Sequence, residues 1–63
     1  SRNKKEQMQY ILEGFPGIGP KTAKKLLEEF KSIKNIVNAP EEEIKKILGE
    51  KGKIIKELTE EMY

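Results

Sequence analysis

The stretch "GFPGIGPKT", residues 14–22, contains the residue types that bind phosphate, namely glycines, a lysine and a threonine. It nearly matches a nucleotide-binding P-loop, in which a lysine directly follows the second of two framing glycines. Gly14 and Gly19 have the P-loop separation, but Pro20 takes the place of the lysine and moves Lys21 one position along. The stretch is therefore either a damaged ATP site or a different turn that meets phosphate in another way.

The residues around this stretch exclude a nucleotide site. A P-loop follows a buried strand of a parallel sheet, whereas the preceding "QMQYILE" has the apolar spacing of an amphipathic helix. A chain of 63 residues is also too short for such a sheet. A dinucleotide fingerprint fails as well, because Thr22 stands where its third glycine would be. We therefore expect neither a bound nucleotide nor any other cofactor.

What remains is a turn that presents backbone N–H groups at the start of a helix. Gly17 and Gly19 allow positive φ and carry no side chain, so an anion can come close to the backbone. Ile18 is expected to turn inward, and Pro20 suits the first turn of a helix whose N-terminus adds partial positive charge. The side chains expected to contact phosphate beside these amides are Lys21, Thr22, Lys24 and Lys25. The alternative is an ordinary tight turn between helices with solvated lysines.

Catalytic and metal sites are not expected. The chain has no cysteine and no histidine, which excludes a thiolate site, a zinc site and a histidine-based dyad. The run Glu41, Glu42 and Glu43 could be read as carboxylates for metal-ion catalysis. Consecutive glutamates on a helix point in different directions, however, and acids are favoured in a first helical turn. We predict that these glutamates only begin a helix.

Length and charge indicate one small domain over residues 1–63, expected to be a piece of a larger protein. No signal peptide is expected at its start, and its apolar runs are too short to span a bilayer. Residues 1–27 carry six basic and two acidic side chains, a net charge of +4. Residues 28–63 carry seven and nine, a net charge of −2. This asymmetry favours an anionic partner for the first part of the chain.

Helical periodicity runs along the whole chain, and no alternating strand pattern appears. We predict an all-α fold of five short helices. The first is expected to span about residues 3–13. The other four are expected to start at Pro20, after Ser32, at Pro40 and after Gly52. The side chains expected to face the core are Met8, Ile11, Leu12, Phe15, Ala23, Leu26, Leu27, Phe30, Ile33, Ile36, Val37, Ile44, Ile47, Leu48, Ile54, Ile55, Leu58 and Met62.

The chain contains an internal repeat at an offset of 32 residues. Residues 17–23 and 49–55 both run from a glycine to an apolar residue, and each segment is followed three residues later by a leucine. This pattern predicts two helix–turn–helix units, with a first hairpin at about 14–20 and a second at about 48–53. A single unit could not bury its apolar face alone, while two facing units could. The alternative is chance similarity between two lysine-rich helices.

The stretch "FPGIGPKTAKKLL" resembles the helix-hairpin-helix motif: hydrophobic-x-Gly-hydrophobic-Gly, three residues, Ala, two residues, then two aliphatics. The matching positions are Phe15, Gly17, Ile18, Gly19, Ala23, Leu26 and Leu27. Such hairpins bind DNA without sequence specificity, because turn amides contact the sugar-phosphate backbone across the minor groove. The resemblance implies this phosphate-contact role for Gly17, Ile18, Gly19, Lys21 and Thr22.

From Glu6 to Tyr63 the chain resembles the tandem helix-hairpin-helix domain that closes the XPF family of structure-specific nucleases, including the archaeal Hef helicase-nucleases. The linker and fourth helix "FKSIKNIVNAPEEEIKKILG" contribute to this resemblance. It implies a DNA-repair parent whose chemistry lies outside these residues, binding to branched, forked or junction DNA, and a cytoplasmic, nucleoid-associated location (nuclear in a eukaryote). The excinuclease subunit UvrC ends in a similar tandem and remains an alternative parent.

The second hairpin, "ILGEKGKII", departs from the motif. Lys51 occupies the place of the second glycine, Gly52 comes one position late, and Glu50 adds a negative charge. The bulky Ile55 in the place of Ala23 is expected to hold the two helices further apart. The candidates for DNA contact here are Gly49, Lys51, Gly52 and Lys53. A purely structural role, or a place in a dimer face, is left open.

A homodimer is also expected, partly because a core of this size is thin. The residues expected at its interface are Tyr10, Phe15, Phe30, Met62 and Tyr63. The rival hypothesis from another class is a protein-interaction module, in which the hairpins only pack and dimerisation is the whole function.

Overall fold

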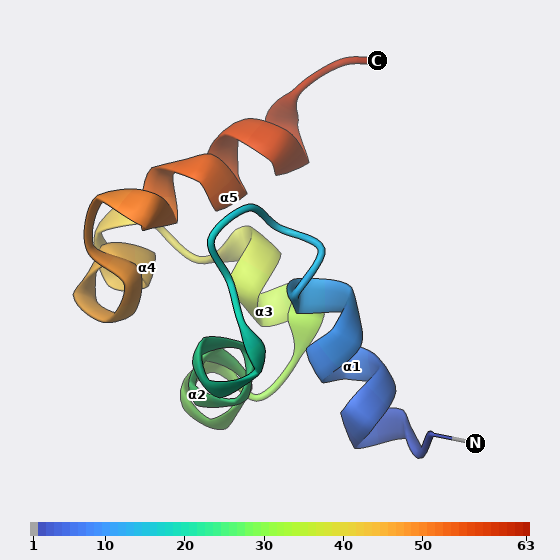
Figure 1. Ribbon diagram of the computed structural model, residues 1–63. Helices are drawn as coiled ribbons and strands as arrows, with labels where there is room; N and C mark the ends of the chain where they lie inside the picture. The colour runs from blue at the N-terminus through green and yellow to red at the C-terminus, as the bar shows by residue number, and fades with distance from the viewer. Residues whose placement is uncertain (1) are drawn as a thin grey trace.

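The computed structural model describes residues 2–63, which form five α-helices and one short 3₁₀ helix, η1 (Figure 1). In chain order they are α1 (Lys4–Leu12), α2 (Pro20–Phe30), α3 (Ile33–Asn38), α4 (Glu41–Leu48), η1 (Gly49–Lys51) and α5 (Gly52–Glu60). The described residues contain no strand. The predicted all-α fold of five helices is therefore confirmed.

Local signals in the sequence account for the helix starts. At α1, the Glu6 N–H donates to Asn3 Oδ1 at 2.8 Å, and the Asn3 N–H donates to Glu6 Oε1 at 3.1 Å. Pro20 occupies the first turn of α2, as predicted. At α3, Ser32 Oγ accepts a hydrogen bond from the Asn35 N–H at 3.0 Å, so Ser32 caps the helix that was predicted to start after it. These caps satisfy N–H groups that have no partner inside the helix.

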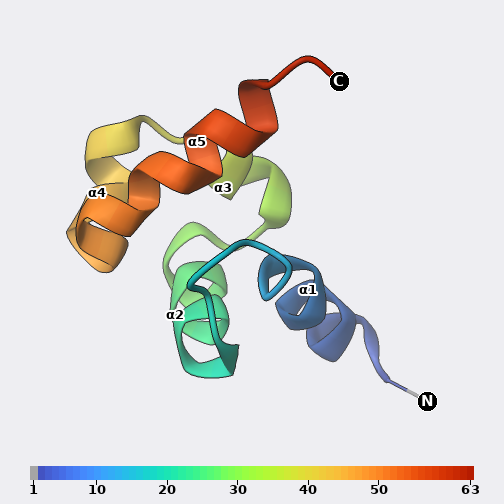
Figure 2. The same ribbon diagram turned by 45° about the horizontal axis from the view of Figure 1, so that its top comes forward.

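The helices form two pairs joined by α3. Figures 1 and 2 show α1 beside α2 in one half of the molecule and α4 beside α5 in the other, with α3 between the halves. The α5 helix is tied to α3 by Lys56, whose Nζ donates to the carbonyl oxygen of Val37 at 2.8 Å. Each pair is one helix–turn–helix unit, so the chain folds as the predicted tandem.

The core lies between the two units and repeats at the predicted offset. Its buried members are Leu12, Ile18, Ala23, Leu26, Ile36, Ala39, Ile44 and Ile55. Leu12 and Ile44 are 32 positions apart and both are fully buried, and the same holds for Ala23 and Ile55. Burying a leucine or isoleucine side chain contributes roughly 1.5–3 kcal/mol. The repeat in the sequence is thus also a repeat in packing.

Three residues predicted to face the core are exposed instead. Ile11 is 57% exposed, Leu58 is 52% exposed and Met62 is 88% exposed. The outer end of α5 and the tail after it extend away from the other helices (Figure 1), so residues there find few packing partners. The α1 helix buries only Leu12 completely, which leaves Ile11 on its outer side.

Gly52 has a packing role that the motif comparison did not indicate. A Cβ atom placed on Gly52 would lie 3.0 Å from Ile44 Cγ2 and 3.2 Å from the backbone nitrogen of Lys45. The missing side chain therefore lets α5 begin in direct contact with α4. Gly52 thus brings the start of α5 against α4, and Ile55 is fully buried further along α5.

We expect Gly52→Ala to lower the free energy of unfolding by about 1–3 kcal/mol, because overpacking against a backbone atom cannot relax easily. Gly19→Ala is the matched control, since no atom lies within 4 Å of a Cβ placed there. Its effect should stay within about 0.5 kcal/mol. Urea unfolding followed by circular dichroism measures both, and equal stability of the two variants would contradict the close approach.

Candidate nucleic-acid interface

The first turn, between α1 and α2, is fixed by hydrogen bonds at both ends. The Ile18 N–H donates to the Phe15 carbonyl oxygen at 3.2 Å, and the Ala23 N–H donates to the Gly19 carbonyl oxygen at 2.9 Å. Gly17 has a φ of +81°, a conformation that L side chains rarely adopt. The turn is therefore specified by its glycine at position 17 and by two backbone bonds.

Four backbone N–H groups of this turn are left for a ligand. The N–H groups of Gly17, Gly19, Lys21 and Thr22 find no hydrogen-bond acceptor among residues 2–63. Those of Lys21 and Thr22 lie in the first turn of α2, where the helix itself provides no acceptor. The space beside Gly19 is open, because no atom lies within 4 Å of a Cβ built there. An anion can therefore reach these donors at the positive end of α2.

Ile18 differs from the expectation that it contacts phosphate. Its side chain is only 6% exposed and its N–H already donates to Phe15. The inward orientation predicted for this side chain is confirmed. Ile18 therefore anchors the turn to the core and offers no donor to a ligand.

The lysines predicted beside the turn lie on two sides of α2. Lys21, Lys24 and Lys25 are all exposed, whereas Thr22 is half-buried. Lys24 also lines a hollow of about 330 Å³ between α1 and α2, together with Lys5, Lys31 and one acidic residue, Glu28. Three of the four charged side chains around this hollow are therefore basic.

The second turn is closed, which means that its glycine N–H groups are hydrogen-bonded within the chain, whereas the first turn is open. The Gly49 N–H donates to the Lys45 carbonyl oxygen, and the Gly52 N–H donates to the Gly49 carbonyl oxygen. Gly52 is buried, while Lys51 and Lys53 are exposed. Gly49 and Gly52 therefore depart from the sequence-based expectation, because their amides hold the chain together and are not available to phosphate.

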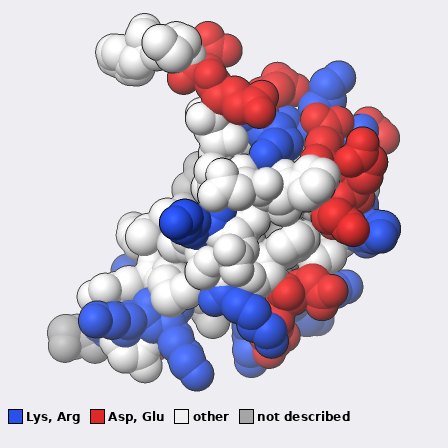
Figure 3. Space-filling model, turned by 180° about the vertical axis from the view of Figure 1, so that it is seen from behind, with Lys and Arg blue, Asp and Glu red and all other residues white. Residues whose placement is uncertain are grey.

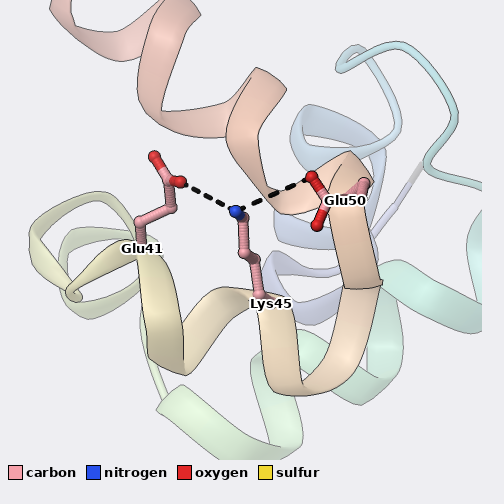
Figure 4. Close-up of polar contacts among 3 residues, drawn as sticks. All are labelled: Glu41, Lys45 and Glu50. Atoms are coloured by element: carbon pink, nitrogen blue, oxygen red, sulfur yellow. Dashed lines mark ion pairs between the residues drawn. The ribbon is translucent and has the colours of Figure 1, made fainter.

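Glu50, which brings a negative charge to the second turn, lies within reach of a lysine. Lys45 Nζ is 3.1 Å from Glu41 Oε2 and 3.7 Å from Glu50 Oε2 (Figure 4). The pKa of Lys45 is raised above its usual value by the hydrogen bond to Glu41 and then by the charge of Glu50. The ammonium group therefore offsets part of the negative charge that Glu50 would present to a phosphate.

Ion pairing is confined to α4 and the turn after it. Within residues 2–63 only Lys45 and Lys46 form ion pairs, the second with Glu43 at 2.8 Å. Figure 3 shows one face of the molecule, with most acidic side chains in the upper half, over α4 and α5, and basic ones along the lower edge. The lysines of the first unit are thus left without an internal counter-charge.

The two turns lie side by side in the fold. A Cβ built on Gly17 would lie 3.3 Å from Lys51 Cδ and 3.8 Å from Lys51 Nζ. The side chain of Lys51, from η1, therefore passes over the glycine that begins the first turn. Sequence reasoning singled out Lys51 as a candidate but gave no signal for this contact across the repeat.

Within residues 2–63, no group of three or more histidine, cysteine, aspartate or glutamate side chains could hold a metal ion. In the same part of the chain, no helix has the length and apolar character needed to cross a membrane.

Two helix–turn–helix units, each with a positive-φ glycine and related by a fixed offset, define a tandem of helix-hairpin-helix motifs. The family described as the SAM-like helix-hairpin-helix tandem matches residues 10–60. The chain belongs to this family.

Curated relatives include larger proteins from bacteria and an archaeon. UvrABC system protein C of Thermosipho africanus is 60% identical over 40 residues, which cover 64% of this chain and 7% of that protein. UvrABC system protein C of Bacteroides fragilis is 49% identical over 57 residues, 89% of this chain and 9% of the relative. The "Putative ATP-dependent RNA helicase" of Methanocaldococcus jannaschii is 39% identical over 62 residues, 94% of this chain and 8% of the relative.

The chain therefore spans less than a tenth of the length of these relatives. No solved structure matches it significantly.

We expect Gly17→Ala to lower the free energy of unfolding by about 1–2 kcal/mol, the cost of a left-handed conformation for a residue with a Cβ. The new methyl group would also crowd the Lys51 side chain. Thermal unfolding against the Gly19→Ala control measures the difference. A Gly17→Ala protein as stable as that control would contradict the conformation assigned to the turn.

Proposed function

We propose that this domain binds DNA through the sugar-phosphate backbone, with the first turn as its main contact. The observation that carries the proposal is the set of four N–H groups in the first turn and at the start of α2 that find no acceptor among residues 2–63, with open space beside Gly19. Amides of this kind donate to phosphate oxygens, and the helix dipole favours the negative charge. Membership in the tandem helix-hairpin-helix family supports the same function.

Binding of this type reads the position of phosphates and carries no direct information on base sequence. The donors are backbone amides, supported by the ammonium of Lys21 and the hydroxyl of Thr22. Lys24 and Lys25 add positive charge along α2. Because the lysines replace counterions on DNA, the affinity should fall steeply as the salt concentration rises.

The parent protein is proposed to be a DNA-repair enzyme, either a structure-specific nuclease of the XPF/Hef type or an excinuclease subunit. The resemblance to the XPF/Hef tandem supports the first, and relatives named UvrABC system protein C support the second. In both cases this domain would place the parent on branched, forked or junction DNA. The parent protein would then act at the nucleoid in the cytoplasm, or in the nucleus of a eukaryote.

A second candidate function is association with another copy of the domain. Five large apolar side chains are exposed, namely Tyr10, Ile11, Leu58, Met62 and Tyr63. Exposed apolar surface of this kind marks protein contacts when it is contiguous. Figure 1 shows the start of α1 and the tail after α5 on the same side of the molecule, and Figure 3 shows the surface hollowed between them. Phe15 and Phe30 pack partly against the core, so they would add less to such an interface.

We expect Gly19→Val and Lys21→Glu each to weaken binding of forked DNA by about tenfold, because a hydrogen bond to a charged group contributes roughly 1.5 kcal/mol. The valine would fill the open space that a phosphate needs, and the glutamate would repel it. Lys34→Glu on α3 is the control with the same charge change. Fluorescence anisotropy on two unrelated sequences measures the effect, and binding like that of the wild type would remove the first turn from the interface.

We expect the wild-type chain to form a homodimer in sedimentation equilibrium and Leu58→Glu to shift it to monomer, because a charge would be buried in an apolar contact. Lys34→Glu makes the same kind of substitution at an exposed polar position on α3 and should leave the dimer intact. A wild-type chain that stays monomeric at every concentration would contradict this second function.

A further inference from the structure

The clearest contact between the two turns is made by Lys51. Its Cδ lies 3.3 Å and its Nζ 3.8 Å from the position that a Cβ of Gly17 would take. The methylene groups of this lysine therefore lie over the glycine of the other hairpin, and its ammonium ends beside the first turn. A side chain at position 17 would block this path.

The internal repeat explains where this lysine comes from. Lys51 stands 32 residues after Gly19, at the place where the helix-hairpin-helix pattern has its second glycine. In the second turn itself, where Lys51 replaces this glycine, the N–H groups of Gly49 and Gly52 are hydrogen-bonded to carbonyl oxygens of the chain. The residue that breaks the motif in the second hairpin is thus the one that reaches the first.

The surroundings of the Lys51 ammonium suit an external anion. Lys51 is exposed and forms no ion pair with any of residues 2–63. The adjacent carboxylate, Glu50, pairs with Lys45 instead. The N–H groups of Gly17 and Gly19, which have no acceptor among the described residues, belong to the turn that the Lys51 stem crosses at Gly17. This turn therefore combines N–H donors with a lysine that has no ion pair among residues 2–63.

We propose that Lys51 belongs to the phosphate site of the first hairpin, so that the two units build one composite site on the DNA backbone. The second hairpin contributes the ammonium group of Lys51 to that site, and its own glycine amides take no part in it. This inference rests on the proposed DNA-binding function. The contact of the lysine stem with Gly17 restricts its rotamers in the free protein, so less conformational entropy is lost when a phosphate binds.

The test compares Lys51→Met with Lys34→Met in the 63-residue chain. Methionine keeps an unbranched stem over Gly17 and removes only the charge, and Lys34 is an exposed lysine on α3. Forked DNA is titrated by fluorescence anisotropy at several salt concentrations. We expect Lys51→Met to weaken binding about five- to tenfold and to reduce the salt slope by about 1. Lys34→Met should change the affinity less than about twofold.

A double variant tests whether the site is shared. If Lys51 and the first turn hold the same phosphate, Lys51→Met should cost much less in a Gly19→Val background than in the wild type, because interacting sites are not additive. Equal losses in both backgrounds would indicate two separate contacts and overturn the composite site.

The failure of this inference is distinguishable from failure of the DNA-binding function. If Gly19→Val loses affinity while Lys51→Met binds like the wild type, the first turn stands and the composite site falls. If Gly19→Val also binds like the wild type, the proposed function falls together with the inference. Amide chemical shifts of Gly17 and Gly19 on adding DNA report the same site independently of affinity, and unshifted signals would count against both.

Discussion

The rest of the structure depends on the burial of apolar side chains between two helical hairpins that are too small to fold alone. Leu12 and Ala23 of the first unit meet their counterparts Ile44 and Ile55 of the second in one core. Because neither unit has a second layer of its own, this shared core is what holds each turn in place. The turn of the first unit is further fixed by Ile18, which enters the same core. Packing and the candidate DNA contact are therefore coupled through the side chain next to the free amides.

The two units share a backbone plan and differ in chemistry. Each turn has a glycine with positive φ, at Gly17 and Gly49. In the first, the chain leaves the turn directly into a helix that begins with Pro20, so the N–H groups of its first turn find no acceptor among residues 2–63. In the second, η1 comes before α5, and the N–H groups of Gly49 and Gly52 donate to carbonyl oxygens within the chain. The same repeat thus produces one open turn and one closed turn.

Much of the fold could be predicted from local sequence signals. Pro20, Ser32 and the apolar spacing were sufficient to place the helices, because caps and periodicity act over a few residues. The exposure of Leu58 and Ile11 could not be predicted in this way. Periodicity identifies an apolar face of a helix, but it does not say whether a neighbouring helix is long enough to cover it.

The candidate site could be predicted only in part, again because sequence patterns indicate local structure and not contacts between elements. The open turn follows from glycines and a proline in sequence, whereas the roles of Gly52 and Lys51 depend on contacts with other elements. Gly52 resembled a misplaced motif glycine, although it is needed for the approach of α5 to α4. The closed amides of the second turn likewise depend on the 3₁₀ geometry of η1, which no letter in the sequence specifies.

The position of the Lys51 side chain means that the hairpins are not interchangeable parts. A protein assembled from two copies of the first unit would have two open turns and no lysine stem across either glycine. One assembled from two copies of the second would have two closed turns whose glycine amides are already bonded. The difference between Gly19 and Lys51 therefore gives the two hairpins separate parts, one a turn with open space beside its glycine and the other a side chain that crosses to that turn.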